Sequence, residues 1–230
     1  MARLAALLAE NEAERARLAA DPALAPALAE LRAWQRARLQ LTYADLAAEE
    51  RYRSAIEFFV AELYGGVDPA PRDRDLRRAA RSFERLLPAR ALAVLEQAIA
   101  LEILTQRLDA ALAAHLPRGE PITRASYAAA YRESAPRAER EAQIATILEI
   151  GAVLDGLVRY AAVGLLVRLA RAPAHAAGLG ALHEFLARGF AAFRATGGAA
   201  EFLATVRARE SRLLERLYGG AADPFEGKAP

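Results

Sequence analysis

Residues 88–115 read PARALAVLEQAIALEILTQRLDAALAAH, and this stretch decides the fold class. Residues of strong helix propensity fill it, chiefly Ala, Leu, Glu, Gln and Arg. Pro88 stands where a helix can begin, because the missing N–H of proline is not needed in a first helical turn. Glu96 and Glu102 interrupt an otherwise apolar pattern. The stretch therefore predicts one long helix that ends at about His115.

The same composition extends over the whole chain. The sequence has 230 residues, of which 54% are apolar, and this is enough for one hydrophobic core. Runs of Val, Ile and Thr, which strands favour, are scarce. We therefore expect an all-α fold, a multi-helix bundle of seven to eight helices around one core.

Glycine and proline mark the expected helix ends. Gly65-Gly66 supplies a left-handed cap at the end of one helix, and residues 116–121, LPRGEP, form the clearest break. Residues 1–218 are expected to form a single helical domain, with a possible weak subdivision near 116–121. Residues 219–230 are polar, contain two prolines and predict a flexible tail.

Charge and hydropathy favour a soluble cytoplasmic protein. The formal net charge is only +2 and the chain has no cysteine, so disulfides are excluded and nucleic acid is not a favoured partner. Acidic residues follow the first apolar run at once, which argues against a signal peptide. Residues 144–170 are long enough to span a bilayer. They contain four charged residues, however, so we expect a buried helix and no membrane span.

The sequence does not indicate a metal or cofactor. The three histidines are His115, His175 and His183, and none belongs to a Glu-x-x-His motif or to an i, i+4 pair. Phosphate-binding glycine motifs and the nucleophile elbow are also missing from the sequence. We therefore predict no catalytic set, no cofactor and no stoichiometric iron or zinc.

Charged residues inside apolar helices form the first candidate site. A lone buried charge costs several kcal/mol, so each must find a partner. Asp155 and Arg159 share a helix face, and a buried pair there predicts that loss of either residue destabilises the fold. The candidate buried polar cluster comprises Glu57, Glu96, Glu102, Asp155 and Arg159.

Arginines at helical spacing form the second candidate, a surface for an anion or an acidic partner. The first group, residues 74–85, repeats along a single predicted helix. The second group consists of Tyr131 and the arginines that follow it. Nearby acidic residues also allow the simpler interpretation of a solvated face. The surface comprises Arg74, Arg78, Arg81, Arg85, Tyr131, Arg132 and Arg140.

The segment Phe58-Phe59-Val60-Ala61-Glu62-Leu63-Tyr64-Gly65 resembles uncharacterised bacterial proteins that are labelled by their "FFLEELY" motif. Val60 and Ala61 replace the Leu-Glu of that label, and the resemblance covers residues 52–75 only. It implies a bacterial helical protein and supplies no activity. Physically, Phe58, Phe59 and Leu63 are expected to face the core, with Tyr64 covering the helix end.

Two functions remain open from the sequence. Long helices with apolar stripes and the lack of a catalytic motif favour a non-enzymatic interaction or scaffold protein that binds a protein partner or itself. The alternative is a helical enzyme or small-ligand-binding protein with a polar pocket inside the bundle. Convergence of the buried charges on one cavity would favour the alternative, whereas separate pairs at helix seams would favour the first.

Overall fold

The computed structural model describes residues 3–63 and 68–230, and within these ranges it contains twelve α-helices, one π-helical turn and no strand. The all-α fold is therefore confirmed, although the described chain is divided into more helices than the seven or eight expected. In chain order the elements are α1 (Arg3–Ala20), α2 (Leu24–Thr42), α3 (Ala44–Ala48), α4 (Glu50–Phe58), the π-helix η1 (Phe59–Leu63), α5 (Ala70–Leu86), α6 (Ala89–His115), α7 (Arg124–Ser134), α8 (Arg137–Val158), α9 (Ala161–Leu169), α10 (Arg171–Ala176), α11 (Gly180–Ala195) and α12 (Ala200–Tyr218).

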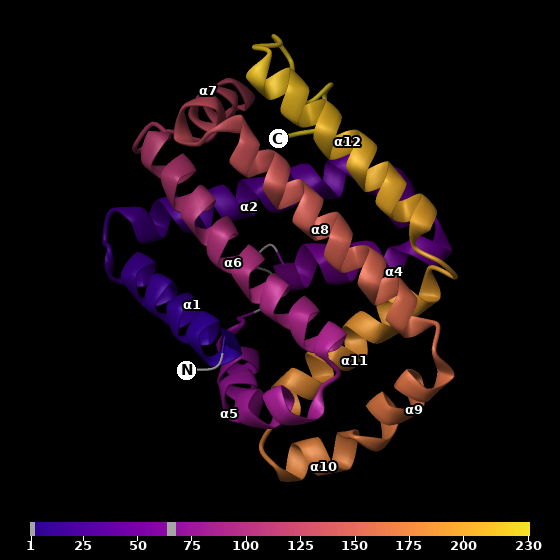
Figure 1. Cartoon of the computed structure of the whole chain (residues 1–230). Helices are drawn as coiled ribbons and strands as arrows, with labels where there is room; N and C mark the ends of the chain where they lie inside the picture. The colour runs from indigo at the N-terminus through magenta and orange to yellow at the C-terminus, as the bar shows by residue number, and fades with distance from the viewer. Residues whose placement is uncertain (1–2, 64–67) are drawn as a thin grey trace.

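Helix α6 lies at the centre of the arrangement (Figure 1). It packs against α1, α2, α7 and α8. Helix α12 runs along α8, and α11 crosses the bundle to pack on α4, α5 and α8. Helices α9 and α10 form the corner beside α11. Because α6 and α7 pack together, the break at residues 116–121 joins helices that share one interface.

The bounds of α6 agree with the sequence prediction, since the helix begins after Pro88 and ends at His115. The next helix, α7, begins at a capping box. The Thr123 hydroxyl accepts from the backbone N–H of Ser126, and the Ser126 hydroxyl accepts from the N–H of Thr123. The helix end predicted at Tyr64-Gly65-Gly66 lies outside the described residues.

The additional breaks occur where the backbone leaves the helical region. Glu49 is extended, with ψ 124°, and separates α3 from α4. The expected single helix through residues 144–170 is split into α8 and α9, which meet at 87°. Tyr160, between them, is also extended, with ψ 115°. An extended residue interrupts the helical hydrogen-bond pattern, so the chain changes direction there before the next helix begins.

Among the described helices, none is by itself both long enough and apolar enough to cross a bilayer. Helices α8 and α9 reach the required length and hydropathy only when taken together, across their bend.

The buried apolar residues gather in three clusters. One joins α2, α7 and the later part of α6, with Leu31 and Leu112 at its centre. A second joins α3, α4, α8 and α12 around Tyr52. The third joins α1, α5, α11 and the earlier part of α6, around Leu4 and Ile103. Between the α6 residues of the first and third clusters lie the buried polar residues Gln106 and Asp109, on the helix that both clusters share.

Residues 219–230, for which the sequence predicts a flexible tail, fold back onto the first cluster. Phe225 and Ala229 are buried. The Phe225 ring meets the rings of Trp34 and Tyr127 edge-on, at centroid distances of 5.4 and 5.7 Å. Arg124 donates to the carbonyl of Ala229 at 2.6 Å. The sequence prediction missed this contact because Phe225 is the only aromatic residue in an otherwise mostly polar segment.

We expect Phe225→Ala to destabilise the protein by roughly 3 kcal/mol, because it removes a buried ring from a packed aromatic cluster. Urea unfolding followed by the fluorescence of Trp34, the only tryptophan, measures this loss. Leu86→Ala is the control, since the Leu86 side chain is exposed and its removal should leave the midpoint unchanged. An unchanged midpoint in Phe225→Ala would show that the tail does not contribute to the core.

Candidate functional site

The candidate buried cluster does not converge on one place. Glu57 is exposed on α4, contrary to the prediction that it is buried. Glu96 lies 3.4 Å from Arg3 across the α1–α6 interface. Glu102, one turn and a half further along α6, pairs instead with arginines of α1 and α5. These carboxylates therefore belong to separate contacts.

Asp155 and Arg159 form the predicted i, i+4 pair, at 2.7 Å, but only one of them is buried. The Arg159 side chain is 62% exposed, which corrects the prediction of a buried pair. Asp155 is buried because it has a second partner: its other carboxylate oxygen accepts from the N–H of Ala199 at 2.8 Å. Ala199 is the residue before α12. Asp155 therefore binds the positive end of α12 and fixes that helix to α8.

The predicted anion or partner surface is only partly a surface. The side chains of Arg74, Arg78, Arg81, Arg85 and Arg132 are exposed. Arg140 is 2% exposed, however, and its guanidinium lies 4.3 Å from the centroid of the Tyr131 ring. Tyr131 packs against the first hydrophobic cluster. These two residues are thus part of the interior, and the remaining arginines stay a prediction.

A cavity of about 550 Å³ lies between α1, α5, α6 and α11, at the boundary of the first and third clusters. Its size falls in the range of small-molecule sites in proteins. Most of its wall is apolar and includes Leu8, Leu28, Ile99, Leu182 and Phe185. Glu102 is the one member of the predicted polar cluster that lines it. This pocket shares Glu102 with the predicted cluster, and its other polar residues differ from those predicted.

Four charged side chains form a network on the cavity wall. Arg15 of α1 pairs with both Asp73 and Glu102. Arg72 of α5 joins the same two carboxylates, at 2.7 Å from Asp73 and 3.3 Å from Glu102. Burial lowers the pKa of Arg15, although the attraction of Asp73 opposes this shift. Two cations and two anions cancel, so the network presents polar edges without net charge.

The guanidinium of Arg72 also lies over the ring of Phe185, 4.9 Å from its centroid. This cation–π contact connects the charged network to α11 on the opposite wall. The Phe58 ring also contacts the Phe185 ring, with the two centroids 5.5 Å apart. The aromatic pair from residues 58–59 thus supports the cavity wall, and Phe59 itself lines the cavity.

The second polar group of the cavity is a pair of amides. Gln106 donates to the side-chain oxygen of Asn11 at 2.7 Å, and both residues line the cavity. Gln106 is 5% exposed, yet its Oε1 has no hydrogen-bond partner among the described residues. The Gln106–Asn11 pair therefore makes this part of the cavity lining polar.

Asp109 is the third polar group, one turn beyond Gln106 on α6. It accepts from Gln35 at 3.1 Å, and Arg32 lies 4.0 Å from it. Burial raises the pKa of Asp109, while Gln35 and Arg32 act in the opposite direction. This end of the cavity is therefore polar, with Gln35 and Arg32 beside the Asp109 carboxyl group.

One signal in the sequence could have located these groups. Glu102, Gln106 and Asp109 are spaced i, i+4, i+7, which places them on one face of α6. A polar stripe on an otherwise apolar central helix indicates a polar interior or a cavity. Their partners Asn11, Arg15 and Arg72 could not be identified, because they come from helices whose packing the sequence does not specify.

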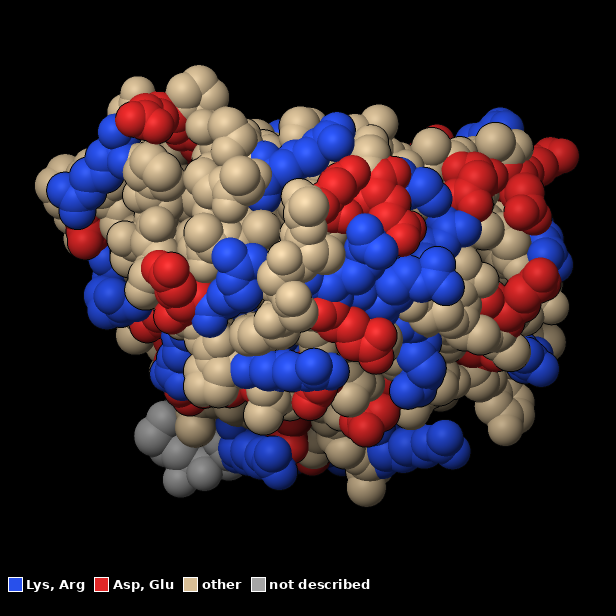
Figure 2. Space-filling model, turned by 90° about the horizontal axis from the view of Figure 1, so that it is seen from above, with Lys and Arg blue, Asp and Glu red and all other residues tan. Residues whose placement is uncertain are grey.

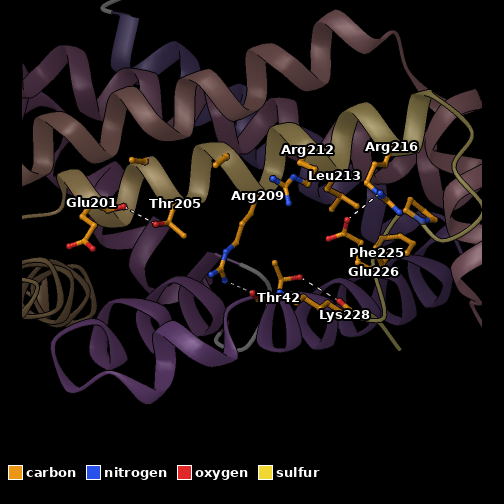
Figure 3. Close-up of a pocket in the computed structure, with 13 residues that line it drawn as sticks. Thr42, Glu201, Thr205, Arg209, Arg212, Leu213, Arg216, Phe225, Glu226 and Lys228 are labelled. Carbon is orange, nitrogen blue, oxygen red and sulfur yellow. Dashed lines mark hydrogen bonds and ion pairs between the residues drawn. The ribbon is translucent and has the colours of Figure 1, made fainter.

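A second hollow, of about 570 Å³, lies between α12, the end of α2 and the C-terminal segment (Figure 3). Arg209, Arg212 and Arg216 project from α12 along it. Arg209 forms two bonds to Asp45, at 2.7 and 2.5 Å, and holds the pKa of that carboxyl at about 2. Arg216 donates to the carbonyl of Asp223 at 2.6 Å. Two of the three arginines thus hold neighbouring segments in place.

Comparison with known proteins places the chain in a family. Residues 14–224 match the family described as "Domain of unknown function (DUF8198)", and the chain belongs to it. Neither the curated proteins nor the solved structures gave a significant match. The matched region contains all of the cavity-lining helices except the beginning of α1.

The two partners Asp155 and Arg159 should respond differently to mutation. We expect Asp155→Ala to cost about 1.5–3 kcal/mol, because it leaves the start of α12 without its charged acceptor. Arg159→Ala should change stability by less than about 1 kcal/mol, as is usual for an exposed ion pair. Thermal or urea unfolding of both variants measures this, with Asp155→Asn as a variant that keeps one acceptor. Equal losses in the two alanine variants would contradict the asymmetry.

Proposed function

We propose that this protein is a non-enzymatic helical binding protein whose central cavity takes an uncharged amphipathic small molecule. The observation that carries the proposal is the cavity of about 550 Å³, whose mostly apolar lining includes the polar pair Gln106 and Asn11. Apolar walls bury the hydrophobic part of a ligand, and a few fixed polar groups orient it.

The chemistry of the lining favours a neutral ligand. Arg15 and Arg72 are each bound by Asp73 and Glu102, so no cation of the network is left to neutralise an incoming carboxylate or phosphate. Glu62, which also lines the cavity, is paired with Arg188 at 2.7 Å. A charged ligand would have to break one of these ion pairs to gain a counter-ion there, whereas a hydroxyl or an amide needs only a polar partner such as the Gln106–Asn11 pair.

The outer surface agrees with recognition inside the bundle. On the face shown in Figure 2, basic and acidic side chains are interspersed. Mixed charges give weak long-range fields, which are of little use for attracting a strongly charged macromolecule. The same proposal includes a cytoplasmic location and, from the resemblance to the FFLEELY proteins around residues 52–75, a bacterial origin.

Dodecan-1-ol is a suitable probe, because it combines one hydroxyl with an apolar chain. Calorimetric titration should show one molecule bound per chain, with dodecanoate at least about tenfold weaker because of its unpaired charge. Ala98→Phe should abolish binding by filling the cavity, which Ala98 lines. Ala93→Phe is the matched control on α6, since Ala93 is exposed.

Circular dichroism should confirm that both phenylalanine variants keep the helical fold. Gln106→Leu tests the acceptor separately, and it should remove the preference for the alcohol over an alkane of equal length. Equal binding of the alcohol by the Ala98 and Ala93 variants, or no binding by the wild type, would contradict the cavity as a ligand site.

A second candidate function, self-association, is favoured by the outer face of α9. Leu165, Leu166 and Leu169 are exposed there, the last two at 66% each, and Tyr160 precedes them. Leu165 and Leu169 are four residues apart and therefore lie on the same side of α9, next to Leu166. Two copies of this apolar surface can pack against each other about a two-fold axis. The corner formed by α9 and α10 projects from the bundle and leaves this strip accessible (Figure 1).

Leu166→Ser with Leu169→Ser should convert a dimer to a monomer in multi-angle light scattering at micromolar concentration. The exposed Leu86→Ser, on α5, is the matched control and should leave the mass unchanged. A monomeric wild type over the whole concentration range excludes self-association through α9 and leaves the cavity proposal unaffected.

A further inference from the structure

The corner formed by α10 and α11 brings together two of the three histidines of the chain. His175 lies on α10, and His183 and Glu184 lie on the first turns of α11. One ligand atom from each residue lies within 4.8 Å of the others. The Nε2 of His175 is 3.2 Å from Glu184, and the Nδ1 of His183 is 4.0 Å from the same carboxylate oxygen.

His183 is oriented by a backbone carbonyl. Its Nε2 lies 2.8 Å from the carbonyl oxygen of Val167, on α9, and a carbonyl can only accept. In the neutral imidazole the proton is therefore on Nε2, which leaves the lone pair on Nδ1. This arrangement is typical of histidines that bind metals, because a hydrogen bond from the other ring nitrogen fixes the orientation of the ring and its tautomer.

The Nδ1 atom of His183 is buried and has no hydrogen-bond partner among the described residues. The residue is 8% exposed, its Nδ1 lies 4.0 Å from the Glu184 carboxylate, and its ring centroid is 6.0 Å from that of His175. A buried acceptor without a donor is unusual in proteins. It indicates that another group completes the site.

The sequence leaves room for the His175 ring. A Cβ at Gly180 would lie 2.9 Å from the Nδ1 and 3.0 Å from the Cε1 of His175. Any larger residue at the start of α11 would therefore displace the ring away from Glu184. Gly180 thus permits the close approach of α10 and α11 at this point.

We propose that His175 Nε2, His183 Nδ1 and the Glu184 carboxylate bind a divalent transition-metal ion of the zinc type. Two imidazoles and one carboxylate are a common set of three zinc ligands, with water in the fourth position. A tetrahedral zinc ion with bonds of ~2.0–2.1 Å requires ligand atoms ~3.3 Å apart. The contact between His175 and Glu184 already has this length, at 3.2 Å.

The remaining contacts must shorten by roughly 1 Å to reach that geometry. His175 and Glu184 can provide this movement, because both side chains are about half exposed, whereas the buried His183 stays fixed. Arg171 lies 3.7 Å from the Glu184 oxygen, but its side chain is 72% exposed and can withdraw into solvent. An ion at this position would connect α10 to α11 beside the contact with α9.

The spacing of the ligands explains why the sequence predicts no metal. The two histidines are separated by a turn and lie on different helices, so they match neither the i, i+4 pattern nor a Glu-x-x-His motif. Only the fold of α9, α10 and α11 places them together, and that fold depends on the bend after α8.

Titration of untagged, metal-free full-length protein with Zn²⁺ in a calorimeter tests the proposal. The wild type should bind one ion per chain. His175→Ala and Glu184→Gln should each weaken binding about tenfold or more. His115→Ala is the matched control, because His115 lies at the end of α6, outside the cluster, and should bind zinc as the wild type does.

His183→Ala should also lose zinc, with circular dichroism and unfolding used to verify that the variant folds. Co²⁺ provides a second readout, since a four-coordinate site gives intense visible absorption that His175→Ala should remove. Binding below one ion for every five chains, or equal weakening by His115→Ala, would overturn the proposal. Unchanged zinc affinity in both His175→Ala and Glu184→Gln would also overturn it. None of these outcomes depends on the cavity ligand.

Discussion

The polar face of α6 is the constraint on which the rest of the structure depends. On this central helix Gln106 and Asp109 are buried and Glu102 is partly buried, so each needs a polar partner. Arg15, Asn11 and Gln35 supply those partners from α1 and α2. Apolar side chains cannot pack closely against groups of this kind, so the core divides into separate clusters and a cavity remains between two of them.

Much of the fold can be predicted from local patterns. The limits of α6 and the Thr123 cap follow from proline, propensity and capping chemistry within a few residues. The bend between α8 and α9 cannot be predicted in this way, because Tyr160 at the break is not a helix-breaking residue type and the packing of α9 on α11 is not a local pattern. The burial of Phe225 depends equally on a distant partner, the aromatic surface around Trp34.

The candidate sites also combine features that can be predicted from the local sequence with features that depend on distant contacts. A sequence identifies charged residues within apolar stretches, and Glu102 and Asp155 were found on this basis. It does not show where each charged side chain lies in the fold. Glu102 lines the cavity, Asp155 caps α12, and Glu57 is exposed to solvent. Histidines on two helices joined by a turn are similarly invisible to spacing rules. In each case the missing information is the relative position of helices distant in sequence.

Helix α12 is held at both of its ends. Asp155 binds the backbone before its first residue, and beyond its last residue the chain returns so that Phe225 enters the first cluster. Helices ordinarily fray from their termini, where amides exchange with solvent first. With both termini occupied, α12 must exchange by detachment of the whole helix from α8. Its amides should therefore form one cooperative unit that opens in a single step, while the corner of α9 and α10 exchanges independently.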